Sequence, residues 1–236
     1  YEDFDKVGFD PRLIRAARRF FYEILREYES SGFILPGHER DIRPEVGNSD
    51  NEVGIREILK QIQFSGFEPP KGMIAVITPQ EILDKMAILI PPDILRSLRS
   101  ISRINPVWGE NKIHGACISN PEGTHIELYN YLFAKPDIPE FGKSFLVVDF
   151  MDVLWHELGH VGHRQMSYAE ILDWEEATQG DNDKDISWYV RYARSISHGR
   201  GKVDDFAESF MFFLTNPAIL ETISPERFEF MNLFFH

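Results

Sequence analysis

The chain has 236 residues, of which 43% are hydrophobic, 13% aromatic and 27% charged, and its formal net charge is −13. This acidic balance argues against sequence-independent binding to nucleic acid or anionic lipid, because both favour a basic surface. The single cysteine, Cys117, excludes an internal disulfide and a multi-cysteine zinc site, and no run of 18 apolar residues predicts a membrane span.

The first 110 residues are predicted to form a mainly helical region. Apolar residues recur there at every third or fourth position, which indicates amphipathic helices. Asp10-Pro11 and Thr78-Pro79 are typical helix starts, because each pairs an N-cap residue with proline at the first helical position. In chain order we expect a helix over residues 10–30, a loop to about residue 51, a helix over 52–63, a buried strand over 73–77, a helix over 79–90 and a helix over 93–104.

Two β-rich runs follow, over residues 112–119 and 124–134. The residues between them, Asn120-Pro121-Glu122-Gly123, form a turn tetrad, so the two runs are expected to pair as a hairpin. An edge strand of this hairpin is able to bind an extended peptide by adding it to the sheet. A small sheet beside helices predicts the α+β class.

Residues 144–163 are expected to form a helix with a buried apolar stripe. The stripe consists of residues with helical spacing: Val147, Met151, Leu154, Leu158 and Val161. The tail from Ile186 is again predicted to be helical, with loop signals over residues 197–201. The helix over 144–163 therefore has one face in the core and an opposite face available for function.

That opposite face carries the motif H-E-x-x-H as His156-Glu157-Leu158-Gly159-His160. Residues four apart on a helix lie about 40° apart, so both imidazoles can bind one ion. Glu157 lies about 100° round from His156, beside the ion, where it can take a proton from a zinc-activated water. The bland alternative is an amphipathic helix whose histidines face solvent.

Three further residues share the histidine stripe. His163 is either another ligand or, in the favoured interpretation, a solvent-facing residue or an outer partner of a ligand. Asp149 and Asp152 are interpreted as acids in the first turn of their helix, where the helix dipole favours them.

A catalytic zinc site needs a third protein ligand, and two familiar spacings fail to supply it. His163 and Met166 stand where H-E-x-x-H-x-x-G-x-x-H requires glycine and histidine. A glutamate placed as in the thermolysin family would fall on Gly180. Glu175 and Glu176 are nearer carboxylates, but neither lies in a motif.

A second motif lies further along the chain, in residues 204–210, which read Asp-Asp-Phe-Ala-Glu-Ser-Phe. This segment resembles the acidic-x-Phe-Ala-Glu-x-Phe helix of the metallopeptidase domain of anthrax lethal factor and related zincins, including the Pro-Pro endopeptidases. The resemblance extends over about residues 148–235 and implies that Asp204 is the third zinc ligand. It also places His198 where the family has a tyrosine that helps the reaction.

The chain departs from the family pattern at two positions. Asp204 replaces a glutamate, and its shorter arm requires the helix to approach the metal more closely. One residue is missing between His198 and the Phe-Ala-Glu segment, so alignment on His198 would select Asp205 instead. We favour Asp204, because ligand and anchor share one helix while a loop absorbs a deletion. Asp205 is then expected to tolerate alanine.

Glu208 leaves two interpretations open, because it lies one helical turn after Asp204 on the same face. It is either an outer partner that orients a ligand histidine or the true third ligand. A bland alternative treats the segment as an acidic helix start followed by a core stripe of phenylalanines: Phe206, Phe210 and Phe213.

Together these features predict an α+β, zincin-like metallopeptidase with a small mixed or antiparallel sheet. Residues 111–236 would form the catalytic region, either separately or as one continuous domain with residues 1–110. The expected site comprises one zinc ion held by His156, His160 and Asp204, with Glu157 as general base and His198 in support. The expected partner is a peptide or protein, and the expected compartment is aqueous, cytoplasmic or secreted. The rival function is a non-catalytic zinc-binding or toxin-like interaction protein.

Overall fold

The structure is a computed structural model, which describes residues 49–104, 115–129, 133–137, 140–180, 185–187, 190–191 and 198–235. The chain divides into two units, residues 1–42 and 43–236, and every described residue belongs to the second. The helix expected over residues 10–30 and the point where a catalytic region was expected to begin, at residue 111, lie outside the described residues.

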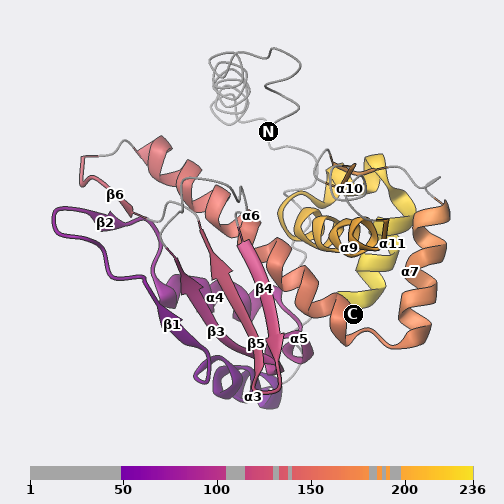
Figure 1. The fold of residues 1–236 in the computed structure, drawn as a ribbon, viewed down its shortest axis with the longest axis horizontal. Helices are drawn as coiled ribbons and strands as arrows, with labels where there is room; N and C mark the ends of the chain where they lie inside the picture. Colours follow the sequence, from indigo (N-terminus) through magenta and orange to yellow (C-terminus); the bar gives the residue numbers. More distant parts are fainter. Residues whose placement is uncertain are drawn as a thin grey trace, which may run out of the picture. The chain divides into compact units, whose positions relative to one another are not determined.

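The second unit combines helices with two small sheets, which confirms the α+β class (Figure 1). The elements in chain order are α3 (Ser49–Leu59), β1 (Gln63–Ser65), β2 (Ile74–Ala75), α4 (Pro79–Leu89), α5 (Pro92–Arg96), β3 (Leu98–Arg103), β4 (Gly115–Asn120), β5 (Gly123–Leu128), β6 (Phe133–Ala134), α6 (Glu140–Gln165), α7 (Tyr168–Gly180), α9 (His198–Thr215), α10 (Pro217–Ile223) and α11 (Pro225–Phe235).

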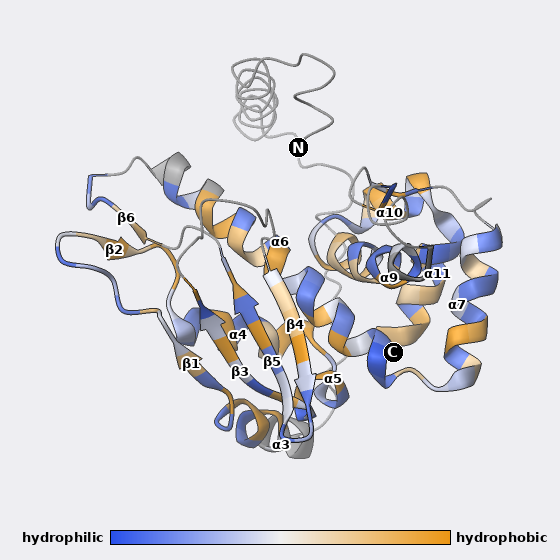
Figure 2. Ribbon diagram, in the orientation of Figure 1, coloured by the Kyte–Doolittle hydropathy of each residue, from blue (hydrophilic) through white to orange (hydrophobic). Residues whose placement is uncertain are grey.

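The larger sheet has the strand order β1-β3-β5-β4 and is mixed. β1, β3 and β5 run parallel, whereas β4 pairs antiparallel with β5 and forms one edge. Buried and partly exposed residues alternate along β5, both strands carry hydrophobic and hydrophilic residues (Figure 2), and Ile101 and Ile126 on the inner face are fully buried. β1 and β3 precede residue 110, so the expected mainly helical region also supplies half of this sheet.

Helix α6 connects the sheet to the C-terminal helices. It packs against β4 and β5 on one side and against α9 on another. Four of the five residues of its predicted apolar stripe are buried, namely Met151, Leu154, Leu158 and Val161. The predicted core face of this helix is thereby confirmed. The side chains of the candidate site, His156, Glu157 and His160, come from other positions on the same helix.

An aromatic cluster holds α7, α9 and α11 together. The ring of Phe206 on α9 lies 5.2 Å from that of Trp174 on α7 and 5.4 Å from that of Phe234 on α11, between ring centroids. Phe206 and Phe210 are fully buried and Phe213 nearly so. The phenylalanine stripe is therefore a core stripe, as the structural alternative predicts. The acidic residues of α9, Asp204, Asp205 and Glu208, are not part of this stripe.

Two local predictions are confirmed in detail. Thr78 caps α4 through a capping box in which its hydroxyl accepts from the Glu81 amide and the Glu81 carboxylate accepts from the Thr78 amide. The turn tetrad joins β4 to β5 in the expected hairpin, with Asn120 paired to Gly123. The Asn120 side chain accepts from two turn amides, which fixes the tight reversal.

The helix expected over residues 93–104 is wrong, because only Pro92–Arg96 is helical and Leu98–Arg103 forms β3. A register shift between Leu98 and Ser100 marks a bulge in this strand. The bulge turns Leu98 and Ile101 to the same buried side although they are three residues apart. Such spacing imitates a helical period.

Two helix starts also differ from expectation. Helix α6 begins at Glu140, so Asp149 and Asp152 are not in its first turn, and their interpretation as dipole-stabilising acids is wrong. Helix α9 begins at His198, inside the segment expected to be a loop. Asp204 and Asp205 therefore lie in the second turn of α9 and not at its start.

Across the described part of the chain, no helix is long and apolar enough to cross a membrane.

Candidate metal centre

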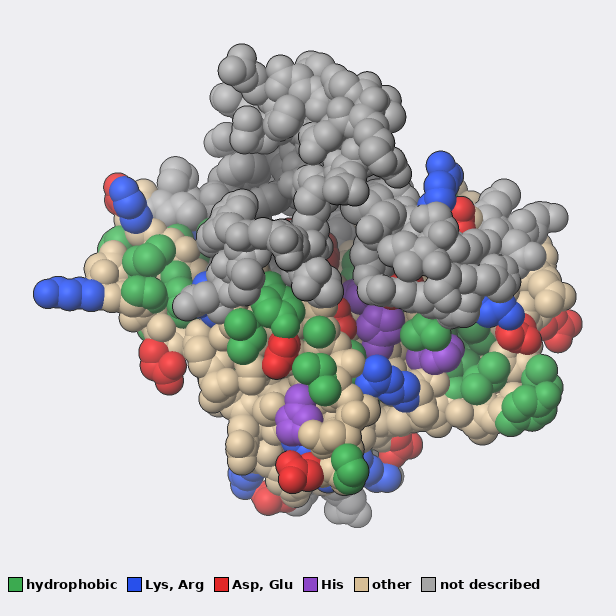
Figure 3. All heavy atoms as spheres, in the orientation of Figure 1, with side chains coloured by type: hydrophobic (Ala, Val, Ile, Leu, Met, Phe, Trp, Pro, Cys, Tyr) green, Lys and Arg blue, Asp and Glu red, His purple; other side chains and the backbone are tan. Residues whose placement is uncertain are grey.

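The two motif histidines lie together where α6 meets α9. Their ring centroids are 4.7 Å apart and the rings are nearly perpendicular. His156 is 8% exposed and His160 is partly buried. In Figure 3, histidine side chains gather near the middle of the face shown, next to acidic and basic side chains. The histidine face is therefore mostly buried where α6 meets α9, and part of it reaches the surface.

Asp204 enters the same space from α9. Its Oδ1 atom lies 3.8 Å from Nε2 of His156 and 3.4 Å from Nε2 of His160. One donor atom from each of the three residues lies within 4.8 Å of the others. Within the described ranges this is the one group of three or more His, Cys, Asp or Glu side chains close enough to hold a metal ion.

The donor set fits a zinc ion in type, and the distances from Asp204 to the two histidines are near those of a zinc site. Imidazole nitrogen and carboxylate oxygen are both zinc ligands, and tetrahedral bonds of about 2.0–2.1 Å place neighbouring donors roughly 3.3–3.4 Å apart. The Asp204 to His160 distance of 3.4 Å matches this spacing, and the 3.8 Å to His156 is slightly longer. Both distances are longer than the donor–acceptor distance of an ordinary N–H···O hydrogen bond.

The short side chain of Asp204 reaches the histidines because α6 and α9 touch through their backbones. A Cβ atom added at Gly159 would lie 2.7 Å from Cα of Ala207 and 3.1 Å from its carbonyl oxygen. Glycine on one helix and alanine on the other thus permit an approach that larger residues would prevent. The closer approach that an aspartate requires is met by this contact.

Glu208 binds the other side of His156. Its Oε1 lies 2.9 Å from Nδ1 of His156, so the carboxylate accepts a hydrogen bond from that nitrogen. This bond keeps a proton on Nδ1 and directs Nε2 toward Asp204 and His160, so that Nε2 would supply the lone pair to a metal ion once its own proton is displaced. Glu208 therefore occupies the position of an outer partner, and Asp204 the position among the donor atoms.

The charges around the donors perturb their protonation. Burial opposes a charged His156, but the Asp204 and Glu208 carboxylates outweigh it and raise the pKa of His156 above its usual value. Burial also opposes a charged Asp204, yet the two histidines lower its pKa well below the usual range. Burial lowers the pKa of His160. Asp204 is thus ionised and His160 neutral at neutral pH, as metal coordination requires, whereas His156 carries a proton that an incoming metal ion would displace.

Glu157 lies beside the donor group but contacts the edge strand β4. Burial raises the pKa of its carboxyl group to about 7, while the positive charge of His156 and a backbone hydrogen bond from Cys117 act in the opposite direction. A Cβ atom at Gly115 would lie 2.6 Å from Glu157 Oε1, so only glycine fits there without displacement. A buried carboxyl group with this pKa is poised to exchange protons near neutral pH.

Asp205 has a different partner from the one that alignment on His198 suggests. Its Oδ2 accepts a hydrogen bond of 2.8 Å from the Arg227 guanidinium of α11, and both side chains are essentially inaccessible to solvent. The structure does not bring Asp205 to the two motif histidines. The expectation that it tolerates alanine stays a prediction for zinc binding, but for the stability of the fold the buried pair argues against it, because the change would leave a buried arginine without this carboxylate.

The remaining sequence candidates lie apart from the donor group or outside the described side chains. His163 packs edge-on against Phe206, with ring centroids 5.3 Å apart. Glu175 forms an ion pair with Lys202 at 2.7 Å. The side chain of His198 is not among those the structure describes, so its predicted role remains a prediction.

Asp152 was interpreted from the sequence as a helix-start acid, but it lies close to Glu208. Burial, with help from the charges of Asp149 and Glu208, raises the pKa of Asp152 to about 7. Sequence reasoning also missed Gly115 and Arg164, which contact Glu157 or the strand beside it. No local signal marks either residue, because their partners come from distant parts of the chain.

Comparison of the chain with protein-family models, with curated proteins and with solved structures finds no match.

Proposed function

We propose that the chain is a zinc-dependent metallopeptidase that hydrolyses peptide bonds. The observation that carries the proposal is the convergence of His156, His160 and Asp204 from two helices onto one point, with Glu157 next to it. Three protein donors leave a fourth tetrahedral position for water or substrate, as in catalytic zinc sites. The partial resemblance to lethal factor and related zincins supports the same class.

The residues divide the chemistry among them. A bound zinc ion would act as a Lewis acid and lower the pKa of water, which would supply a hydroxide-like nucleophile near neutral pH. Glu157 takes the proton from the attacking water and returns it to the leaving amine. Burial raises the pKa of its carboxyl group to about 7 in the metal-free chain, and the charge of a bound zinc ion would lower this pKa and favour the ionised base. Glu208 keeps Nε2 of His156 directed toward the other donors, and the resemblance assigns His198 a supporting role.

An extended peptide or protein segment is the proposed substrate. β4 pairs with β5 on one side, and in the described part of the chain no strand pairs with its other side. Glu157 accepts a backbone hydrogen bond from Cys117 in this strand, so this edge and the proposed general base are neighbours, and a peptide would pair beside Cys117, whose backbone groups are already bonded to α6. A peptide added to this edge would bring its backbone next to the donor group.

Substitution of Glu157 by Gln tests the proposal, because the amide keeps the shape of the side chain and cannot accept the proton. The full chain, reconstituted with zinc, is assayed for zinc content and for cleavage of a mixed peptide library by mass spectrometry. We expect wild type to bind about one zinc and cleave peptides, and Glu157→Gln to keep zinc with roughly 100- to 10,000-fold less cleavage.

Two results would overturn the proposal. A wild-type chain that remains free of zinc after reconstitution has no metal centre. A wild-type chain that binds zinc but cleaves nothing, with Glu157→Gln indistinguishable from it, is a non-catalytic zinc protein, which is the rival function. His160→Ala serves as the control for metal dependence, because it removes a donor without touching Glu157.

A further inference from the structure

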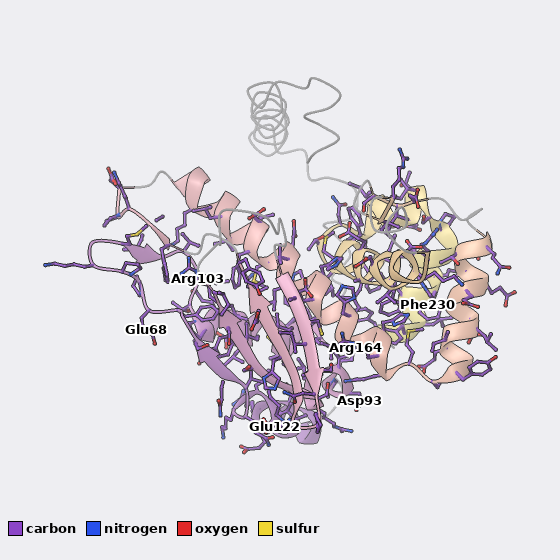
Figure 4. All side chains as sticks on the ribbon, viewed as in Figure 1. Glu68, Asp93, Arg103, Glu122, Arg164 and Phe230 are labelled. Atoms are coloured by element: carbon purple, nitrogen blue, oxygen red, sulfur yellow. The ribbon has the colours of Figure 1, made fainter. Side chains whose placement is uncertain are left out.

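Arg164 connects the helix of the metal centre to the edge strand. It lies in the last turn of α6, one turn beyond His160, and Figure 4 labels it where α6 passes β4. Its guanidinium donates a 3.0 Å hydrogen bond to the carbonyl oxygen of Cys117 and another to the Ser119 hydroxyl. It also lies 3.3 Å from the Cys117 sulfur. The Arg164 side chain thus forms hydrogen bonds to two residues of β4, Cys117 and Ser119.

Cys117 is bonded through its backbone to α6 although it belongs to a β-strand. Its amide donates to the Glu157 carboxylate, and its carbonyl accepts from Arg164. In an antiparallel pair, residues alternate between those bonded to the neighbouring strand and those whose polar groups point outward. Cys117 is opposite Ile126 in the pairing with β5, and its backbone groups are the outward-pointing kind.

Gly115 of β4 lies directly against Glu157, the proposed general base. A Cβ atom on Gly115 would lie 2.6 Å from Oε1 and 2.8 Å from Cγ of Glu157, so the strand backbone and the carboxyl group touch. A displacement of β4 relative to α6 would therefore move or release Glu157. Arg164 is the charged side chain that ties this part of β4 to α6.

We propose that Arg164 is a positioning residue for Glu157: it fixes β4 on α6 and so holds the carboxyl group between Gly115 and the Cys117 amide. This inference rests on the proposed peptidase function. Arginine suits the task because its planar fork offers several donors at once, whereas a lysine ammonium is a point charge that binds the two acceptors less well. The guanidinium acts through Glu157 and needs no contact with substrate.

Cys117 provides a measure of the contact that is independent of activity, since it is the only cysteine of the chain. Burial raises the pKa of its thiol to about 11, and the charge of Arg164 opposes this rise. Loss of the guanidinium alone would make the thiol less acidic and slower to alkylate. Faster alkylation after its removal therefore reports a more accessible thiol, and an increase that persists in Arg164→Lys, whose side chain still covers the sulfur, reports that β4 has separated from α6.

The test compares wild type, Arg164→Ala and Arg164→Lys with a matched control, Arg99→Ala. Arg99 is also exposed and also donates to a backbone carbonyl of the same hairpin, that of Glu122, but at the turn and away from Glu157. Each full-length variant is reconstituted with zinc. Zinc content, the rate of Cys117 alkylation by iodoacetamide, and kcat and KM on a cleaved peptide are measured.

For Arg164→Ala we expect zinc to be retained and Cys117 to be alkylated about tenfold faster or more, the factor that one charge-assisted hydrogen bond gives. We expect kcat to fall about 10- to 100-fold, as for a misplaced catalytic group, with a smaller change in KM. Arg164→Lys should lie between the two, and millimolar guanidinium should restore part of kcat to Arg164→Ala. Arg99→Ala should match wild type in all three measurements.

Unchanged alkylation and unchanged kcat in Arg164→Ala would overturn the inference. So would a loss of kcat equal to that in Arg99→Ala, or one that neither lysine nor guanidinium reduces, because these describe a general loss of stability. If wild type proves to have no peptidase activity, the proposed function fails by itself. The alkylation rates then still decide whether Arg164 holds β4 on α6.

Discussion

Replacing Gly159 by alanine should weaken zinc binding although the new methyl group touches no donor atom. The methyl carbon would lie 2.7 Å from Cα of Ala207 and 3.1 Å from Cβ of Phe210. Carbon atoms not bonded to each other prefer about 3.5–4.0 Å, so α6 and α9 must separate by roughly 0.8 Å. Metal–ligand bonds tolerate only about 0.2 Å. Asp204, one turn from Ala207, would thus be pulled out of reach of the ion.

The expected loss is about 10- to 100-fold in zinc affinity, the scale on which disturbed support of a ligand acts. A longer arm should offset the separation. Asp204→Glu adds one methylene, about 1.5 Å, which overfills the wild-type site and weakens it. In the Gly159→Ala background the same change should restore affinity. Competition with a zinc chelator measures the wild type, both single variants and the double variant.

Gly162→Ala is the matched control, because it adds the same methyl group to α6 less than one turn further on. Its Cβ would meet Ile94 and Phe234 side-chain atoms at 3.4–3.5 Å, which is ordinary contact. Zinc affinity of this variant should equal that of wild type. The reasoning would be refuted if Gly159→Ala bound zinc as tightly as Gly162→Ala, or if Asp204→Glu weakened both backgrounds equally.

Two further predictions concern the acidic residues of α9. Asp204→Ala should abolish stoichiometric zinc binding, whereas Glu208→Ala should reduce affinity only about 10- to 100-fold, since it supports a ligand histidine. The reverse order in zinc titrations would make Glu208 the ligand. Asp205→Ala should lower the free energy of unfolding by about 3–5 kcal/mol, because Arg227 would remain buried without its carboxylate. A urea midpoint equal to that of wild type would contradict this.

The elements that the sequence predicts well are those set by local signals. Helix α6 follows from its periodic apolar residues, and the β4–β5 hairpin follows from its turn tetrad. The sequence of strand β3 predicts a helix because a bulge changes which residues share a face, and the bulge depends on pairing with β5. Strand β1 escaped notice because three residues carry too little pattern.

Only the part of the candidate site that lies on a single helix, α6, can be predicted from the sequence. His156 and His160 follow from spacing on α6, but Asp204 and Glu208 lie about 40° apart on α9 and no helical wheel separates them. Their roles differ because of where α6 crosses α9, at Gly159 and Ala207, which is tertiary information. Arg164 and Cys117 are similarly far apart in sequence, so their contact has no local signature.

The same limit explains why the partner of Asp205 has no sign in the sequence, and it shows what orients α9. A wheel of α9 alone directs Asp205 about 100° away from Asp204, and α11 covers that side with Arg227. The buried pair with Arg227 fixes the rotation of α9 about its own axis. With that rotation fixed, Asp204 and Glu208 face α6, where one reaches the donor group and the other the Nδ1 atom of His156. The proposed metal centre would therefore depend on an ion pair that lies about 100° round the helix from Asp204, its carboxylate donor.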